Sequence, residues 1–182
     1  IHLKVSNSDG IVSMVENNAI DLGVVEAPVT NKNLLVEDCR TDQLVAISPP
    51  NHPLAEKKRV RLEDLLDFSF ICREEGSGTR EVISEYVNKV DKTGHGLNIS
   101  MELGSPEAVK GAVEAGMGIS VVSRATIQKE LKLGTLVEIP LDPPLERPFS
   151  FVHQKQKFRH RVMEKLLDFA RAYCEVHADD NG

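Results

Sequence analysis

Short hydrophobic runs alternate with amphipathic segments along most of the chain. The runs predict strands, and segments with apolar residues three or four positions apart predict helices. Strands are predicted at 2–6, 21–25, 44–47, 68–72, 97–103, 119–122, 136–139 and 147–154, and helices at 8–18, 61–67, 80–90, 105–116, 123–134 and 158–173. This alternation is typical of an α/β protein with parallel sheets.

Particular residues mark some of the helices. Ser105 followed by Pro106 is the strongest start signal, because serine caps helices and proline is favoured at the first helical position. Ser8 before Asp9 predicts another start. The last helix is predicted to be amphipathic, with one apolar stripe at steps of four, four, three and four: Phe158, Val162, Leu166, Phe169 and Tyr173.

Two proline-rich points divide the predicted elements into two lobes. Pro49-Pro50 follows a buried strand, and Pro143-Pro144 precedes the final strand. The first lobe would be discontinuous in sequence and the second continuous. Proteins of this architecture bind small molecules in the cleft between lobes, at helix N-termini beyond strand ends.

Composition narrows the class of protein. The 182 residues carry a formal charge of −6, which disfavours nucleic-acid binding by this segment alone. No apolar run is long enough to span a membrane, and the first residues do not resemble a signal peptide. The three scattered cysteines, Cys39, Cys72 and Cys174, suit free thiols in a reducing compartment, so we expect a cytoplasmic protein. A redox sensor at Cys72 is the alternative to plain strand packing.

The segment 68–80 is the best candidate for ligand contact. A predicted strand ends there in Gly76-Ser77-Gly78-Thr79, which opens a helix. Such a corner can present backbone N–H groups to an anion, and the two hydroxyls add donors. An ordinary helix cap is the competing interpretation. Glu26, at the end of its strand, would face the same cleft unless it is simply a solvated carboxylate.

Catalytic and metal chemistry are poorly supported, and neither an enzyme nor a cofactor is predicted. Glu74 and Glu75 are adjacent and point opposite ways in extended chain, so they do not form an acid/base pair. There is no nucleophile elbow, HExxH motif or complete dinucleotide fingerprint. A basic cluster before and within the last helix is interpreted as a solvated surface: Lys155, Lys157, Arg159, His160 and Arg161.

Five phrases together resemble the effector-binding domain of LysR-type transcriptional regulators. They are IDLGVVEAP (20–28), VAISPPNHPLA (45–55), LEDLLDFSFICREEGSGTR (62–80), MELGSPEAVKGAVEAGMGISVVSR (101–124) and RPFSFVHQKQKF (147–158). Their order and spacing cover nearly the whole chain. The resemblance implies two Rossmann-like lobes of the type 2 periplasmic-binding-protein kind, about 1–47 plus 151–182 and about 48–150, joined by two crossover strands.

The resemblance also implies which residues act. The effector, a small and anionic metabolite, would contact Asn7, Ser8, Glu26, Ser77, Gly78 and Thr79. The helix from Arg80 would form one side of a dimer contact through Arg80, Ile83, Ser84 and Val87, and the full-length protein would be a dimer or tetramer. The family's winged helix-turn-helix and the first strand and helix of its effector domain have no counterpart in this sequence.

We therefore hypothesise that effector binding stabilises one arrangement of the lobes, and that this signal reaches a DNA-binding domain outside this sequence. DNA would be contacted only through that domain. Two alternatives use the same scaffold: a solute-binding protein and an enzyme. The sequence leaves open the effector's identity, the target genes and the direction of regulation.

Overall fold

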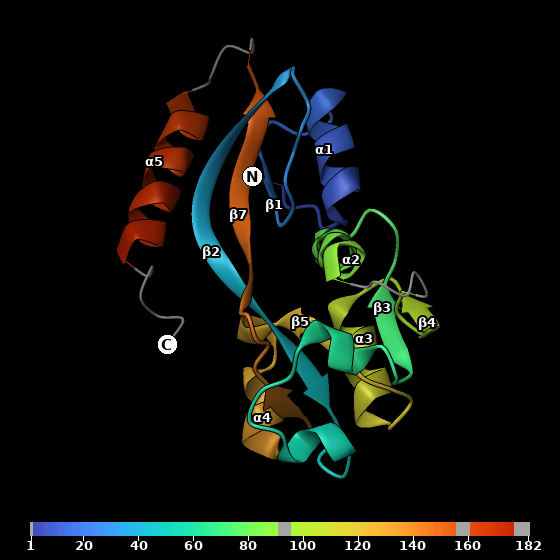
Figure 1. The fold of residues 1–182 in the computed structure, drawn as a ribbon. Coiled ribbons are helices and arrows are strands. Elements are labelled where there is room, and N and C mark those ends of the chain that lie inside the picture. The colour runs from blue at the N-terminus through green and yellow to red at the C-terminus, as the bar shows by residue number, and fades with distance from the viewer. Residues whose placement is uncertain (1, 91–95, 156–160, 177–182) are drawn as a thin grey trace. The chain divides into compact units, whose positions relative to one another are not determined.

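The computed structural model describes residues 2–90, 96–155 and 161–176. Tertiary contacts divide the chain into two units. Unit 1 comprises Ile1–Asp42, Gly76–Gly78 and Arg147–Gly182, and unit 2 comprises Gln43–Glu75 and Thr79–Glu146. Two long strands, β2 (Leu34–Ser48) and β7 (Leu145–Gln154), are drawn in Figure 1 and have residues in both units. The predicted lobe boundaries near residues 47 and 150 stay a prediction.

Unit 1 is a small sheet with a helix on each face. Its elements are α1 (Ser8–Glu16), β1 (Gly23–Val25), the first part of β2, most of β7, and α5 (Arg161–Val176). β1 pairs antiparallel with β7, which lies beside β2. α1 and α5 lie on opposite sides of these strands (Figure 1). The core beneath α1 consists of Ile11, Val15, Val25, Leu34 and Val152.

Unit 2 combines two sheets with helices of several lengths. β3 (Phe70–Arg73) pairs parallel with β4 (Ile99–Leu103), while β5 (Ser120–Ser123) and β6 (Val137–Ile139) both pair antiparallel with β2. The α-helices are α2 (Gly78–Val90), α3 (Pro106–Glu114) and α4 (Gln128–Leu133). Short 3₁₀ turns occupy η1 (Pro53–Glu56), η2 (Leu62–Leu65) and η3 (Arg124–Thr126). Phe70, Leu44 and Ile119 are completely buried between these layers.

The predicted α/β class is confirmed, but strand direction needs a correction. The sheets were expected to be parallel, and the pairing of β3 with β4 is parallel. The pairings of β1 with β7 and of β2 with β5 and β6 are antiparallel. Hydrophobic periodicity marks which face of a strand is buried and carries no information about which way its neighbour runs.

The predicted strand at 2–6 is wrong. Those residues adopt no regular structure, and Leu3 and Val5 are 88% and 90% exposed. A strand needs a neighbouring backbone to satisfy its N–H and C=O groups, and none of the described strands pairs with this segment. The helix that follows begins at Ser8, within the predicted range, but its N-cap is Asn7 and not Ser8.

The apolar stripe of the last helix faces outward. An amphipathic helix normally turns its stripe to the core. Here the stripe residues within the described part of the chain are exposed, from 40% to 68%: Val162, Leu166, Phe169 and Tyr173. Phe158 lies outside the described residues, as does most of the basic cluster. The inner face instead presents Leu167, which is completely buried, followed by Arg171 and Cys174.

Two of the three cysteines are not free thiols. Cys39 on β2 and Cys174 on α5 form a disulfide, so the prediction of free thiols is wrong for this pair. It is confirmed for Cys72, which is free and buried in β3. Sequence spacing could not reveal the pair, because 135 residues separate its members. No described helix combines the length and apolar character needed to cross a membrane.

The predicted start of α3 is confirmed, and its cap can be tested. The Ser105 Oγ accepts a hydrogen bond of 3.2 Å from the backbone N–H of Ala108, and Pro106 is the first helical residue. Ser105→Ala is expected to lower the free energy of unfolding by about 1 kcal/mol, because one N-terminal N–H loses its protein acceptor. Urea unfolding measures this, and Ser105→Asp should restore most of the loss. Equal stability of all three proteins would contradict the assigned cap.

Candidate functional site

The segment Gly76–Thr79, called the glycine corner from here on, lies against the start of α1. The Asp9 backbone N–H donates to the carbonyl oxygen of Gly76 at 3.2 Å, and the Asn7 side chain caps α1 by accepting from the N–H of Gly10 at 2.9 Å. Gly76 has a φ of +79°, a conformation that favours glycine. A Cβ there would stand 3.2 Å from Nδ2 of Asn7. Chain segments about 70 residues apart therefore meet at one helix N-terminus.

Gly78 brings the same corner onto the end of β1. A Cβ on Gly78 would lie 2.6 Å from the carbonyl oxygen of Glu26 and 3.0 Å from Cβ of Ala27. These are separations that a side chain cannot tolerate, so glycine is required by close backbone packing. Unit 1 thus gathers five of the six predicted effector residues around one corner: Asn7, Ser8, Glu26, Ser77 and Gly78. The sixth, Thr79, follows directly in the chain as the first residue of the next part of unit 2.

A buried arginine that the sequence did not single out holds Glu26. The Arg147 guanidinium contacts the Glu26 carboxylate at 2.8 Å and the Asp42 carboxylate at 2.9 Å. Arg147 and Asp42 are each 2% exposed, whereas the side chain of Glu26 is 39% exposed. Glu26 is therefore an ion-paired carboxylate with one side open, and the prediction that it is simply solvated does not describe it.

This trio could not be found from sequence spacing. Asp42 and Arg147 are 105 residues apart and are joined only because β2 and β7 are neighbours in one sheet. A weak signal existed, since an arginine inside a predicted strand needs either an exposed face or a buried carboxylate partner. The guanidinium also lies 5.8 Å from the ring centroid of Phe149, within the range of a cation–π contact.

The two hydroxyl residues of the corner are both buried. Ser77 is 4% exposed and Thr79 is 7% exposed. Thr79 also lines a small hollow in unit 2, together with Cys72, Arg80, Ile83, Ser84 and Ser120. Its cavity volume of about 20 Å³ holds water but no metabolite. This hollow is therefore not an effector pocket by itself.

Glu74 and the Cys72 thiol near the corner do not have the character of catalytic groups. Glu74 makes a two-pronged ion pair with Arg73, at 2.7 and 2.9 Å. Burial raises the pKa of the Cys72 thiol, so the thiolate is disfavoured at neutral pH. These observations argue against the alternative of a redox sensor at Cys72.

The residues predicted for a dimer contact separate into two groups. Ile83 and Val87 are each 4% exposed and pack into the core of unit 2, so they have almost no surface to offer a partner. The reason is that α2 turns its apolar face inward. Arg80 and Ser84 are partly exposed; Arg80 pairs with Glu102 and donates to the carbonyl of Arg73. The dimer contact through α2 stays a prediction, and Arg80 and Ser84 have the exposed surface for it.

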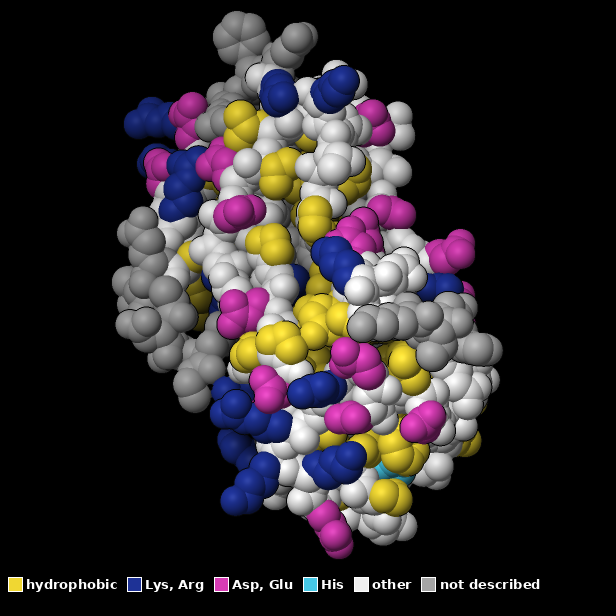
Figure 2. Space-filling view, in the orientation of Figure 1, with side chains coloured by type: hydrophobic (Ala, Val, Ile, Leu, Met, Phe, Trp, Pro, Cys, Tyr) yellow, Lys and Arg dark blue, Asp and Glu magenta, His cyan; other side chains and the backbone are white. Residues whose placement is uncertain are grey.

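Charge on the visible face is mixed. Figure 2 shows acidic and basic side chains interspersed over that face, with hydrophobic side chains between them. This pattern fits the formal charge of −6 spread over 28 acidic and 22 basic residues.

Comparisons with known proteins agree on one family. The family model described as the LysR substrate binding domain matches residues 1–175. The HTH-type transcriptional regulator YeiE of Escherichia coli is 36% identical over 177 residues, covering 96% of this chain and 57% of that protein. The RuBisCO operon transcriptional regulator of Allochromatium vinosum is 34% identical over 185 residues, covering 97% of this chain and 59% of that protein. The chain thus spans somewhat more than half the length of these relatives.

Solved structures show the same fold. The regulatory domain of CcmR from Synechocystis, in complex with 2-PG, has a TM-score of 0.86 and 32% identity, covering 96% of this chain and 83% of that one. The effector binding domain of QuiR, in complex with shikimate, has a TM-score of 0.84 and 22% identity, covering 94% and 80%. The fold of these neighbours is the two-lobed, periplasmic-binding-protein-like one.

Proposed function

This chain belongs to the LysR substrate binding domain family, and on that basis we propose that it is the effector-sensing part of a cytoplasmic transcriptional regulator. Its relatives are named transcriptional regulators. DNA would be bound by a separate helix-turn-helix domain, and the full-length protein would act as a dimer or tetramer. The chain would sense by binding alone, with no catalytic step.

The effector would be a small organic anion held at the glycine corner of unit 1. The observation that carries this proposal is the meeting of the α1 N-terminus with Gly76–Gly78, because helix N-termini favour negative charge and glycines allow close backbone approach. Asn7, Ser8, Ser77 and Gly78 would contact the anion, with Thr79 as the next residue of the chain. The CcmR domain, whose structure contains 2-PG, is a precedent for an anionic effector.

Glu26 would contribute selectivity. Its carboxylate is partly neutralised by Arg147, and its exposed side can accept a hydrogen bond from a hydroxyl of the effector. A dianion seated directly on this carboxylate would be repelled. We therefore propose an effector that presents its negative charge to the glycine corner and a hydroxyl to Glu26. Binding would favour one conformation of the domain, and this preference would be passed to the DNA-binding part.

Calorimetric titration with a panel of small organic anions, with and without a free hydroxyl, tests the proposal; 2-phosphoglycolate and shikimate are two of them. Once a ligand is found, Thr79→Ala should weaken its binding about 3- to 10-fold, because one hydrogen bond is lost. Thr135→Ala is the matched control, since Thr135 is exposed in the turn after α4 and should leave affinity unchanged.

In the full-length regulator, Thr79→Ala should weaken the response to effector while leaving affinity for DNA in place. Electrophoretic mobility shifts with and without effector measure both. Loss of DNA affinity together with the response would contradict the assignment, as would an unchanged response.

A further inference from the structure

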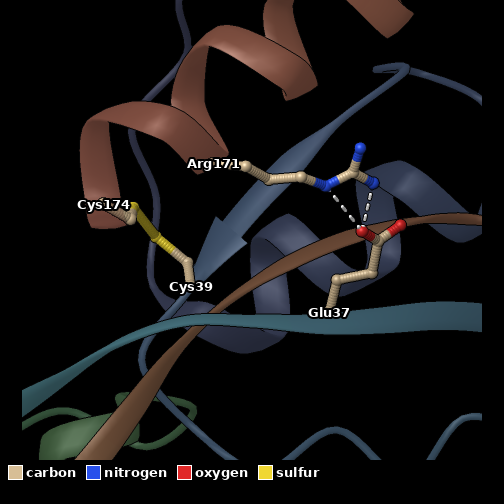
Figure 3. The surroundings of a disulfide bond; sticks show 4 residues. All are labelled: Glu37, Cys39, Arg171 and Cys174. Atoms are coloured by element: carbon tan, nitrogen blue, oxygen red, sulfur yellow. Dashed lines mark hydrogen bonds and ion pairs between the residues drawn. A yellow bond between two sulfur atoms is a disulfide. The ribbon is translucent and has the colours of Figure 1, made fainter. Parts of the chain in front are cut away.

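The disulfide joins the last turns of α5 to β2. Cys39 and Cys174 have Cα atoms 6.0 Å apart, and both residues are only partly buried (Figure 3). Thiol–disulfide exchange depends on access to the sulfur atoms, and neither of these two cysteines is fully buried.

Among the residues that the structure describes, few buried apolar side chains fix this end of α5. The inner face of the helix carries Leu167, Arg171 and Cys174 at steps of four and three, which places them on one side. Of these, only Leu167 is a buried hydrophobic residue, and the helix's apolar stripe points to solvent. Broad apolar contact is what normally fixes a helix to a sheet, and Leu167 is the one buried apolar side chain in the described part of α5.

An ion-pair cluster lies beside the disulfide. The Arg171 guanidinium donates to the Glu37 carboxylate through Nε and Nη2, as Figure 3 shows. The other carboxylate oxygen of Glu37 is 3.0 Å from Nε2 of the buried His153. The hydrogen bonds from Arg171, and next those from His153, hold the pKa of Glu37 below its ordinary value of 4.5, so this carboxylate is ionised at neutral pH. Arg171 is 40% exposed, and an ion pair at that exposure holds a helix only weakly.

We propose that Cys39 and Cys174 are a reversible redox site: their disulfide fixes the end of α5 to β2, and its reduction releases that end. In the reducing direction a dithiol attacks one sulfur, the Cys39–Cys174 bond breaks, and the dithiol leaves as its own disulfide. Two electrons and two protons pass to the cysteine pair. In the oxidising direction a small-molecule disulfide takes them back. This site goes beyond the proposed effector function and needs no effector.

In a reducing compartment, a disulfide of this kind is expected to form and break repeatedly. Disulfides there are rare, and those that form are usually transient and redox-sensing. This step rests on the proposed cytoplasmic location, whereas the experiment below does not. Cys72 provides an internal comparison, because it is buried in β3 and its pKa is raised by burial.

The test equilibrates the protein in buffers of reduced and oxidised glutathione, followed by denaturation, alkylation and mass measurement. Oxidised protein should carry one alkylated cysteine and reduced protein three. Hydrogen exchange of both forms is then compared. Amides of α5 should exchange about tenfold faster after reduction, while amides of α3 stay unchanged, because the released region is local.

Two variants control the result. Cys174→Ser should show fast exchange in α5 in both buffers, and Cys72→Ser should keep the full difference between them. Three outcomes would overturn the proposal: no disulfide in the oxidised buffer, a disulfide that the native protein keeps in reduced glutathione, or exchange that rises equally in α3 and α5. An equal rise in both helices would show that the disulfide stabilises the whole fold and not the end of α5 alone.

Discussion

Arg147→Met is expected to lower the free energy of unfolding by about 3–5 kcal/mol, because the buried carboxylate of Asp42 would lose its ion pair with the guanidinium. Asp42 is 2% exposed, and its carboxylate contacts the guanidinium at 2.9 Å through both Nε and Nη2. Methionine has a similar length and packs into irregular spaces, so most of the loss reports the missing charge. Urea unfolding of the protein measures the change.

Two further variants separate this effect from simple loss of a side chain. The double variant Asp42→Asn with Arg147→Met removes both charges and should recover part of the stability, since breaking a buried pair costs more than replacing it. Arg59→Met removes an exposed arginine and should change stability by no more than about 0.5 kcal/mol. A loss below about 1 kcal/mol for Arg147→Met would show that Asp42 is hydrated or protonated without the arginine.

The same substitution would also free Glu26. Its carboxylate would lose a partner at 2.8 Å and gain negative character at the glycine corner. Binding of an anionic effector should therefore weaken beyond what the loss of stability explains, which titration at a temperature well below unfolding can show.

Gly78→Ala is expected to lower the free energy of unfolding by about 1–3 kcal/mol, because the added methyl group collides with backbone. Its nearest neighbours would be the Glu26 carbonyl at 2.6 Å and Cβ of Ala27 at 3.0 Å. Neither is the end of a flexible side chain, so the corner or the end of β1 has to shift. Thermal and urea unfolding measure the loss.

Gly111→Ala is the matched control and should change stability in the opposite direction. Gly111 lies inside α3, is exposed, and has nothing within 4 Å of an added Cβ. Alanine is a better helix former than glycine, so a gain of about 0.5–1 kcal/mol is expected. If Gly78→Ala were as stable as the unchanged protein, the close approach of the glycine corner to β1 would have to be rejected.

The sequence by itself determined those features that depend on residues close together in the chain, such as helix starts and turns. The start of α3 at Ser105 and Pro106 is set by a cap and a fixed φ, which act within one helical turn. The glycine corner could be predicted because small residues between a hydrophobic run and an amphipathic one are typical of a tight turn that leads from a strand into a helix. The five family-like phrases then indicated the family and, through it, the fold.

Only the tertiary structure decided which distant residues become partners. Asp42 meets Arg147 across 105 residues, and Cys39 meets Cys174 across 135, because β7 and α5 return to β2. The tertiary structure also leaves the apolar stripe of α5 exposed, although its periodicity is that of a helix packed on a core. Periodicity shows that one side of a helix or strand is apolar. Which element packs against that side, and in which direction it runs, depends on packing across the whole chain.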